Sequence, residues 1–523
     1  MRGVEIFLLG TEGAGVLWAV KPTANGARYD WSVTNRSPNP VVVRSVRLEF
    51  DMHRFVGAPR MFRNGYQSWS TCDIATFGED LDPSSYADNP FFQGAHHADG
   101  RTVANEYELR SEWVTVLGDD SDDRLLVGFI GSGNHDGTLR LTHGVEGDTE
   151  LHAEAFLGDL ELAPGESREL DPIVIVHGKD EGELLAAWAD EVATVAKARN
   201  RAPFQVGWCS WYHYFHDVTE DDVRANLALA APFPFDVFQI DDGYQAAIGD
   251  WLETNDKFPS GLAPLAHEIS EAGFRPGIWL APFLAAPESR VAREHPDWLA
   301  GFRPGKALKA WVNPGWGGPM YALDTTNPEV LRHLASVAAA LKAMGFTYLK
   351  LDFTFAPSFD GIWQDRTMTP AQRVRAGFEA IRRGAGDDAF LLGCGAPLAH
   401  VVGVVDGNRI GPDVAPLWEP RPETEVIPGY LHTQPATRFA QDSTRLRQFM
   451  HRRLWLNDPD CVMLRTSKTK LTEDQIREWA RTVGSSGGMV LVSDDLALLG
   501  EEARALLDEV VAAGRQADEV AAG

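Results

Sequence analysis

From about residue 203 onward, the chain repeats one pattern: a short apolar run ends in polar residues, and a helical segment follows. Parallel strands need a crossover segment between them, so this alternation is typical of a parallel sheet. The apolar runs occupy residues 206–211, 237–241, 276–281, 348–352, 390–394, 404–409, 454–456 and 489–492. Eight such units predict a closed (β/α)8 barrel, and a doubly wound open sheet is the alternative.

Helix boundaries between these runs are well marked. Asn327 and Thr369 are capping residues that each precede a proline, and Gly345 ends the first of the two helices. Residues 288–323 form a long insertion after the third strand, and residues 501–513 are expected to form the closing helix. In a barrel of this kind, functional residues gather at the carboxyl ends of the strands.

In the first third of the chain, apolar and polar residues follow a different pattern. Up to about residue 177, short segments of alternating polarity such as 41–50, 113–117 and 125–130 are separated by Gly, Asn, Asp and Pro. This spacing predicts an antiparallel β-sandwich. A helix at residues 181–198 follows, and its buried face is expected to consist of Leu184, Leu185, Trp188, Val192 and Val195.

A chain of 523 residues exceeds the usual size of a single core. We therefore expect three segments: an N-terminal β-sandwich domain at 1–178, a helical connector at 179–202 and a catalytic barrel at 203–523.

Charge and cysteine usage restrict the class of partner. The chain has 48 Lys and Arg against 75 Asp and Glu, a net charge of −27 that disfavours nucleic acids and anionic membranes and favours a neutral small substrate. No apolar run approaches the ~20 residues of a membrane span, and the one after Glu5 is too short for a signal peptide. The four cysteines lie far apart without a CxxC pair, so we expect reduced thiols and a cytoplasmic protein.

Two carboxylates stand out at strand ends. Asp352 ends the fourth run two residues after Lys350, which places both side chains on one side of a strand, where the lysine favours an ionised Asp352. Asp413 follows Arg409 in a loop after the sixth run. Hydrolysis of a glycosidic bond uses two such carboxyl groups, one that attacks and one that protonates the leaving oxygen. The alternatives are a capping or solvated residue and a structural ion pair with Lys350.

Other strand ends add groups suited to a sugar. Asp241 ends the second run and Asp242 follows it, where the two can bind vicinal hydroxyls or, alternatively, a metal. Trp211 and Tyr212 at the end of the first run and Trp279 in the third offer aromatic faces to sugar C–H groups, although aromatic residues also fill cores.

The remaining polar candidates have plainer interpretations. His213 and His216 lack a ligand-spaced series and are expected to be satisfied or exposed. Cys394 has no partner motif for a thiol nucleophile and can be a small core residue, whereas Arg409 is a candidate hydroxyl donor.

Taken together, these residues resemble glycoside hydrolase family 36, the melibiase-type α-galactosidases. The resemblance spans residues 60–415 and rests on Asn64-Gly-Tyr-Gln-Ser-Trp69-Ser, Trp211-Tyr212, Asp241-Asp242, Trp279, Lys350-Leu-Asp352-Phe353, Cys394, Arg409 and Asp413. Two departures are visible: the Arg409-Ile-Gly-Pro-Asp413 loop differs from that of many relatives, and the C-terminal β-domain that relatives often carry is absent or reduced.

The resemblance implies a retaining mechanism without metal or cofactor, in which Asp352 is the nucleophile and Asp413 the acid/base. It also implies that Asp241, Asp242 and Lys350 hold the C3, C4 and C6 side of the galactosyl ring. The other implied substrate-binding residues are Trp69, which covers the pocket, Cys394 and Arg409 near C2, and Trp211, Tyr212, Trp279 and Phe353.

The predicted function is an exo-acting α-galactosidase on small oligosaccharides such as melibiose or raffinose. Within the family, an α-N-acetylgalactosaminidase and a galactosyl-transferring synthase remain alternatives. A non-catalytic carbohydrate-binding protein and a metalloenzyme using Asp241 and Asp242 are alternatives of other classes. The oligomeric state is left open.

Overall fold

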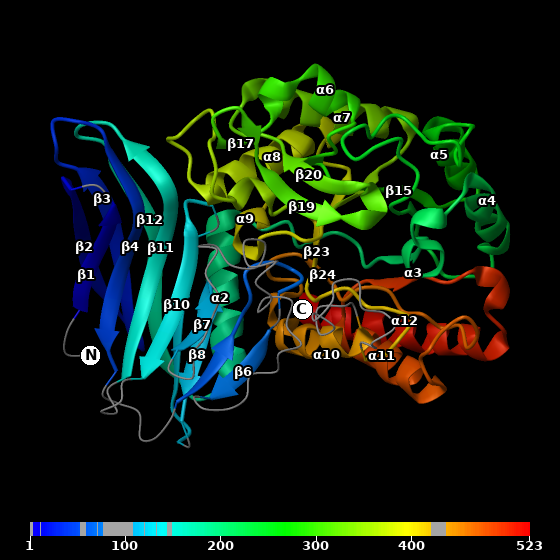
Figure 1. Ribbon diagram of the computed structural model, residues 1–523. Helices are drawn as coiled ribbons and strands as arrows, with labels where there is room; N and C mark the ends of the chain where they lie inside the picture. Colours follow the sequence, from blue (N-terminus) through cyan, green and yellow to red (C-terminus); the bar gives the residue numbers. More distant parts are fainter. Residues whose placement is uncertain are drawn as a thin grey trace.

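The computed structural model describes residues 4–10, 12–52, 59–70, 72–76, 108–119, 121–131, 133–143, 149–419 and 436–523. Figure 1 shows antiparallel strands in blue and cyan beside a region of strands and helices in green to red. Helix α2 (Glu181–Ala196) lies between these two parts.

Within the described residues, the first 178 positions form two antiparallel sheets. The five-stranded sheet has the order β1 (Val4–Gly10), β4 (Val41–Asp51), β11 (Thr149–Leu162), β10 (Asp136–His143) and β7 (Glu108–Glu112). The seven-stranded sheet has the order β2 (Ala14–Thr23), β3 (Gly26–Asn35), β12 (Ser167–Gly178), β9 (Arg124–Phe129), β8 (Val114–Gly118), β5 (Arg60–Arg63) and β6 (Asp73–Thr76).

The alternating pattern accounts for how these sheets are buried. Val46, Leu48 and Phe50 on β4 are two residues apart and fully buried, as expected for one face of a strand. Tyr29 on β3 packs edge-on against Phe50, with ring centroids 5.3 Å apart. Because β3 and β4 belong to different sheets, this contact joins the two sheets through their inner faces.

Helix α2 is positioned by Trp188. The side chain packs against Trp113 of the antiparallel part, with centroids 4.7 Å apart, and against Phe449 of the barrel part, at 6.2 Å. The predicted buried face is confirmed at four positions, but Val195 is 54% exposed. The prediction fails there because Val195 lies in the last turn, directly before the helix ends at Ala196.

The predicted barrel is confirmed. In the described stretches 149–419 and 436–523, eight parallel strands adjoin in chain order: β13 (Val206–Cys209), β14 (Val237–Ile240), β15 (Arg275–Leu280), β21 (Tyr348–Leu351), β22 (Phe390–Gly393), β23 (Gly407–Arg409), β24 (Leu456–Asp458) and β25 (Val490–Val492). β25 pairs with β13, and the Met489 amide donates to the Asn457 carbonyl at 2.8 Å across the remaining seam. This near-closure rules out the open-sheet alternative.

Three strands begin later than the sequence predicts, the eighth by a single residue at Val490. The sixth starts at Gly407 because the amides of Val404 and Val405 both bond to the Val401 carbonyl in a turn. The seventh is Leu456–Asp458, two residues later than expected, because the Leu454 amide still bonds back to Met450.

The barrel helices follow the predicted caps. Asn327 accepts from the Glu329 amide at the start of α7, Gly345 ends that helix, and Thr369 forms a capping box at the start of α8. The longer helices are α4 (Glu220–Leu229), α5 (Leu262–Glu271), α7 (Pro328–Met344), α8 (Pro370–Ala385), α10 (Thr437–Leu446), α11 (Glu473–Ser486) and α12 (Glu501–Ala522), the last extending beyond the predicted 501–513.

Short helices and short strands lie between the barrel strands and the longer helices along the chain. The short helices are α3 (Trp211–Tyr214), η2 (Phe215–Asp217), α6 (Arg290–Glu294), η3 (Pro296–Trp298), η4 (Pro314–Trp316), η5 (Ala356–Ser358), α9 (Leu398–Val401), η8 (Gln448–Met450) and η9 (Leu496–Leu498). The predicted insertion and its approach contain the small strands β16 (Leu284–Ala285), β17 (Gly301–Arg303), β18 (Lys306–Ala307), β19 (Lys309–Asn313) and β20 (Gly318–Ala322).

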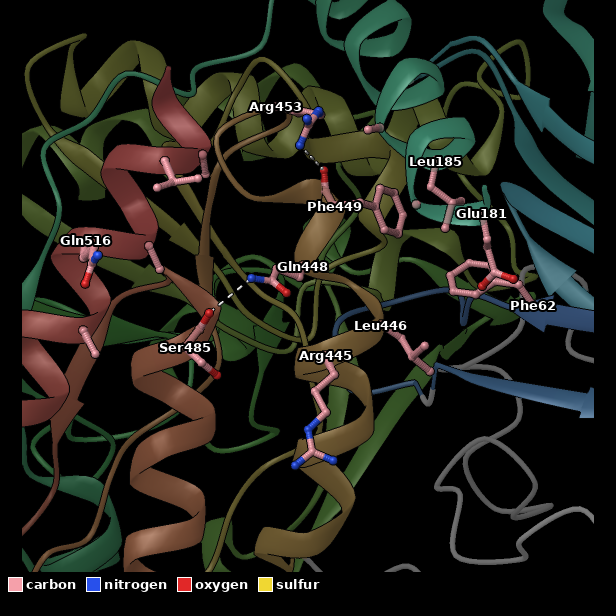
Figure 2. A pocket seen from close by; sticks show the side chains of 16 residues that line it. Phe62, Glu181, Leu185, Arg445, Leu446, Gln448, Phe449, Arg453, Ser485 and Gln516 are labelled. Carbon is pink, nitrogen blue, oxygen red and sulfur yellow. Dashed lines mark hydrogen bonds between the residues drawn. The ribbon is translucent and has the colours of Figure 1, made fainter. Parts of the chain in front are cut away.

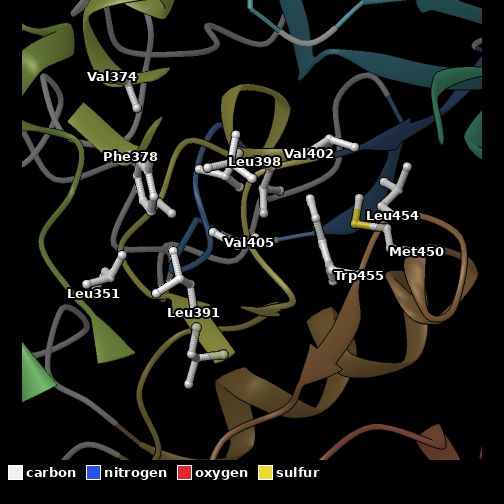
Figure 3. Packing of buried hydrophobic residues seen from close by; sticks show 14 of the residues in the cluster. Leu351, Val374, Phe378, Leu391, Leu398, Val402, Val405, Met450, Leu454 and Trp455 are labelled. Atoms are coloured by element: carbon white, nitrogen blue, oxygen red, sulfur yellow. The ribbon is translucent and has the colours of Figure 1, made fainter. Parts of the chain in front are cut away.

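An apolar layer fixes the helices on the barrel wall (Figure 3). Phe378 of α8 and Leu391 of β22 belong to this layer together with Leu398, Val405 and Trp455, and all five are buried. Truncating a buried phenylalanine to alanine typically costs about 3–5 kcal/mol. The layer thus holds the strand ends in a fixed arrangement.

A hollow of about 810 Å³ lies where the two parts meet α12 (Figure 2). Phe62, Leu185 and Phe449 line it from three different elements, and Gln448 donates to the Ser485 carbonyl at 3.2 Å beside it. It contains none of the polar strand-end residues. Among the described residues, no helix has the length and apolar character needed to span a bilayer.

Candidate active site

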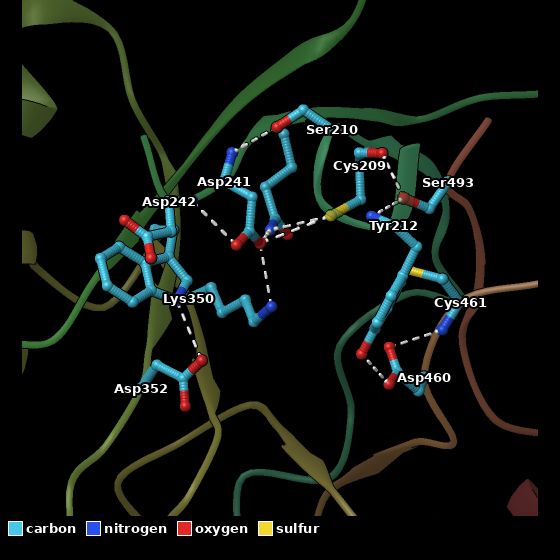
Figure 4. Close-up of polar contacts among 12 residues, drawn as sticks. Cys209, Ser210, Tyr212, Asp241, Asp242, Lys350, Asp352, Asp460, Cys461 and Ser493 are labelled. Carbon is cyan, nitrogen blue, oxygen red and sulfur yellow. Dashed lines mark hydrogen bonds and ion pairs between the residues drawn. The ribbon is translucent and has the colours of Figure 1, made fainter. Parts of the chain in front are cut away.

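The carboxyl ends of the barrel strands bring predicted polar residues to one mouth of the barrel, and Figure 4 shows Asp241, Asp242, Lys350 and Asp352 there. Asp241 directly follows β14, Asp352 directly follows β21, and Arg409 is the last residue of β23. All three side chains are buried. Residues up to 168 positions apart in the sequence therefore form one polar cluster.

Asp352 is held by two N–H donors. Trp279 Nε1 lies 2.9 Å from Asp352 Oδ2, and the Phe353 amide lies 2.8 Å from Oδ1. Burial raises the pKa of Asp352, whereas the charge of Lys350 and the hydrogen bond from Trp279 lower it. Trp279 is itself fully buried, and the edge of its indole ring carries the nitrogen that bonds the carboxylate.

Lys350 forms its ion pair with Asp241. Lys350 Nζ lies 2.9 Å from Asp241 Oδ2, the oxygen that also accepts from Gln239 Nε2 at 2.6 Å. The structural ion pair considered for Asp352 is therefore absent at this position, and Lys350 acts on Asp352 only through its charge. Burial lowers the pKa of Lys350, but Asp241 and the other acidic groups around it together outweigh burial. The pKa of Lys350 therefore lies well above its usual value.

Asp242 is fixed from three directions. Gln245 Nε2 donates to Oδ1 at 2.6 Å, and Trp316 Nε1 donates to Oδ2 at 2.7 Å. His216 Nδ1 lies 3.1 Å from the same Oδ2. Trp316 comes from the insertion after the third strand, and sequence reasoning missed it because nothing in that irregular segment places it near Asp242.

Arg409 binds three carboxylates. Its Nη1 lies 2.8 Å from both Asp413 Oδ1 and Asp460 Oδ2, and its Nε lies 3.3 Å from Asp458 Oδ2. Tyr212 donates its hydroxyl hydrogen to Asp460 Oδ2, as Figure 4 shows. Sequence reasoning missed Asp458 and Asp460, although both lie within four residues after the apolar run 454–456.

Asp413 differs from Asp352 in its surroundings. Its side chain is 32% exposed, and Arg409 holds it at one oxygen. Burial raises the pKa of Asp413, Arg409 opposes this rise, and the Asp352 carboxylate adds to it. The two carboxyl groups are thus close enough to influence each other, and a raised pKa suits a group that must release a proton.

Trp69 reaches the site from the antiparallel part. The Ser68 amide donates to the Ala396 carbonyl at 3.1 Å, and the Ala396 amide donates to Ser68 Oγ at 3.0 Å, which fastens the Trp69 loop to the barrel. Trp69 packs edge-on against Phe353, with centroids 4.8 Å apart. Among the described residues, its buried Nε1 has no hydrogen-bond partner.

Cys394 and Trp211 complete the predicted set. Cys394 is buried beside Trp69, and burial together with Asp352 raises the pKa of its thiol well above the usual value. Such a thiol is a poor nucleophile. Trp211 is half-buried and packs against Phe215 and His216.

Comparisons with known proteins point to one family of enzymes. The Melibiase family profile matches residues 193–360. The chain is 23% identical over 281 residues to the α-galactosidase AgaA of Geobacillus stearothermophilus, a match that covers 50% of this chain and 37% of AgaA. The chain therefore matches well under half the length of that curated relative.

Solved structures match over nearly the whole chain. The α-galactosidase TtGalA of Thermus thermophilus, solved with p-nitrophenyl α-D-galactopyranoside, is 30% identical with a TM-score of 0.72, covering 97% of this chain and 94% of TtGalA. The family 36 α-galactosidase AgaA is 14% identical with a TM-score of 0.63, covering 98% and 73%, and shares the fold. The chain therefore belongs to glycoside hydrolase family 36, the melibiase-type α-galactosidases.

Proposed function

We propose that this protein is a retaining exo-α-galactosidase that hydrolyses terminal α-galactosyl residues of small oligosaccharides such as melibiose and raffinose. The observation that carries the proposal is the pairing of a well-anchored, buried Asp352 with a more exposed Asp413 whose pKa is raised in part by Asp352. The relative TtGalA, which was solved with a nitrophenyl α-galactoside and with stachyose, supports the substrate class.

In the proposed mechanism, Asp352 attacks the anomeric carbon while Asp413 gives its proton to the leaving oxygen, and the glycosidic bond breaks. The product of this step is a covalent galactosyl-enzyme. Asp413, now ionised, removes a proton from water, and the water oxygen displaces Asp352. The two donors to Asp352 fit the first role, because hydrogen bonds from N–H groups favour the ionised form.

Asp241, Asp242 and Lys350 are proposed to hold the C3, C4 and C6 hydroxyls. Their positions are fixed before substrate binds, because Gln239, Gln245 and Trp316 already bond the two carboxylates. A glucoside would leave some of these buried polar groups unpaired, which is costly.

The remaining predicted residues are proposed to make further contacts with the sugar. The unpartnered Nε1 of Trp69 is a donor for a sugar hydroxyl, and Trp211 offers its half-exposed ring at the rim. Phe353 packs beside Trp69, and Arg409 and the small Cys394 are proposed to lie near C2. Tyr212 acts through Asp460, because its hydroxyl is already bonded there.

The domain arrangement is proposed as predicted: a β-sandwich at 1–178, a connector at 179–202 and the barrel at 203–523. The contact of Tyr29 with Phe50 supports a sandwich. A cytoplasmic location is proposed because Cys72, Cys209, Cys394 and Cys461 are all buried free thiols, as is usual in a reducing compartment.

The test is a panel of nitrophenyl α-glycosides with galactose, N-acetylgalactosamine and glucose as the sugar. We expect hydrolysis of the galactoside to exceed that of the other two, and Asp352→Ala to lose activity by on the order of 10³-fold or more. Preference for the N-acetylgalactosaminide would identify the alternative specificity. Binding of galactosides without hydrolysis by the unmodified protein would identify a carbohydrate-binding protein instead.

A further inference from the structure

Asp460 lies at the centre of the bonds that surround Asp413. Its Oδ2 accepts from Arg409 Nη1 at 2.8 Å, from the Val414 amide at 3.0 Å and from the Tyr212 hydroxyl. Its Oδ1 accepts from the Cys461 amide at 2.7 Å. The side chain is fully buried, so all of these bonds are made away from solvent.

Two of these bonds bear directly on Asp413. Val414 is its neighbour in the chain, so the bond to the Val414 amide fixes the backbone of the loop that carries Asp413. Arg409 Nη1 is the same nitrogen that bonds Asp413 Oδ1, at the same distance of 2.8 Å. Asp460 and Asp413 therefore share one guanidinium nitrogen.

The charges around the shared guanidinium do not balance. Arg409 is one cation among three carboxylates, Asp413, Asp458 and Asp460. Burying an excess of like charge is unfavourable, so the group favours holding a proton. In agreement, burial raises the pKa of Asp460 to about 6, against the opposing effect of Arg409.

Other titratable and charged groups face this pair from the surrounding elements. They are Tyr212 of α3, Lys350 of β21, Asp352 after β21, Cys394 after β22, and Asp458 and Cys461 at and after β24. Lys350 favours ionised carboxylates, whereas Asp352 and Asp458 disfavour them. Only Asp460 among these groups also bonds the backbone next to Asp413.

We propose that Asp460 is the positioning residue of the acid/base: its carboxylate anchors the Asp413 loop and takes up part of the charge of Arg409 that would otherwise favour ionised Asp413. This inference rests on the proposed role of Asp413. Without the charge of Asp460, Arg409 acts on Asp413 with less opposition, so Asp413 loses its proton at lower pH.

The test is Asp460→Asn, assayed on melibiose and on nitrophenyl α-galactoside across pH. Melibiose has a poor leaving group that needs protonation, whereas nitrophenolate leaves with little help. We expect turnover of melibiose to fall roughly 10- to 100-fold and turnover of the nitrophenyl substrate to fall far less. We also expect the alkaline limb of the pH profile of melibiose turnover to move to lower pH by about half a pH unit or more. Equal losses on both substrates with an unmoved alkaline limb would overturn the proposal.

A matched control is Asp494→Asn. Asp494 is also fully buried and also bonds an arginine, Arg465, at 2.6 Å, but no described bond connects its side chain to Asp413 or Val414. We expect this variant to lower thermal stability and to leave the alkaline limb in place. A limb shift of equal size in Asp494→Asn would count against a specific role of Asp460.

A second variant tests the same proposal if Asp460→Asn folds poorly. Tyr212→Phe removes one donor from Asp460 Oδ2 and so favours protonated, uncharged Asp460. The expected shift of the alkaline limb has the same direction and a smaller size, and a shift to higher pH would contradict the proposal.

Asp413→Ala distinguishes a failure of the acid/base assignment of Asp413 from a failure of the positioning role of Asp460. If this variant hydrolyses melibiose as well as the unmodified protein does, the acid/base assignment itself fails. If Asp413→Ala loses melibiose hydrolysis selectively and Asp460→Asn does not, only the positioning role fails.

Discussion

Lys350 Nζ lies 2.9 Å from Asp241 Oδ2, although β15 separates the strands from which the two residues come. Alternate strands of a barrel contribute to the same interior layer, so the second and fourth strands can meet across the third. The pair fixes a carboxylate and an ammonium group for substrate hydroxyls. Among the described residues, Asp352 is thereby left without a direct cationic partner.

Replacing Lys350 by Met leaves Asp241 buried without its cation. Breaking a buried ion pair typically costs about 3–5 kcal/mol, so we expect a clear fall in denaturation temperature. The pKa of Asp352 rises further without the lysine charge, so the acid limb of kcat/KM moves to higher pH. Lys342→Met, which removes a surface pair with Asp388, is the control and should change neither property appreciably.

Trp279→Phe removes one of the two N–H donors to Asp352 while keeping an aromatic side chain. Since that hydrogen bond lowers the pKa of Asp352, its loss raises this pKa, and the nucleophile becomes protonated at higher pH. The expected result is a shift of the acid limb of kcat/KM to higher pH. Trp251→Phe alters a neighbour that packs on Trp279 at 5.8 Å, and a similar shift there would contradict this explanation.

Arg447 connects the Trp69 loop with the Asp413 loop. Its Nε donates to Asn64 Oδ1 at 2.9 Å, and its Nη1 donates to the carbonyls of Ser68 and Ile410 at 3.2 and 2.9 Å. We expect Arg447→Met to destabilise the protein by about 3 kcal/mol and to lower kcat/KM, because both loops lose their common anchor. Thermal unfolding and kinetics test this, and unchanged kinetics would show that the loops hold their positions without Arg447.

Asp518 gives α12 a pH-dependent attachment. It accepts from Arg452 Nε at 2.6 Å and from His451 Nε2 at 2.8 Å. Although burial opposes it, these bonds lower the pKa of Asp518 from 3.8 to about 2. The unfolded chain then binds more protons than the folded one between these values, so the stabilisation is present above pH 3.8 and is lost as the pH falls toward 2.

Asp518→Asn should therefore lower the denaturation temperature at pH 7, and the difference from the unmodified protein should narrow as the pH falls below about 4. Denaturation temperatures of both proteins between pH 7 and pH 3 measure this difference. A gap that stays constant across that range would contradict the assigned ion pair.

Much of the barrel was predictable from the sequence because apolar runs and caps are local signals. The run at 348–352 predicts β21 and ends in Asp352, which directly follows β21 in the structure. Strand boundaries were less predictable where turns intervene: the bond from the Leu454 amide to Met450 delays β24 by two residues and puts Asp458 at the strand end.

The partners of the site residues were harder to predict, because they depend on tertiary contacts. Alternation along a strand places Lys350 and Asp352 on one side, but it does not show that Asp241 on another strand is the nearer carboxylate. Trp316 reaches Asp242 from an irregular insertion with no periodic pattern. Asp460 owes its place to a turn after β24 with a φ angle of 88°.

The central claim is that Asp352 is the nucleophile. The most direct measurement is to trap the protein with a fluorinated α-galactosyl substrate that slows hydrolysis of the covalent intermediate, and to map the labelled peptide by mass spectrometry. The account predicts a single galactosyl adduct on Asp352 and no adduct in Asp352→Ala. An adduct on Asp413, Asp460 or any other residue of the unmodified protein would contradict it.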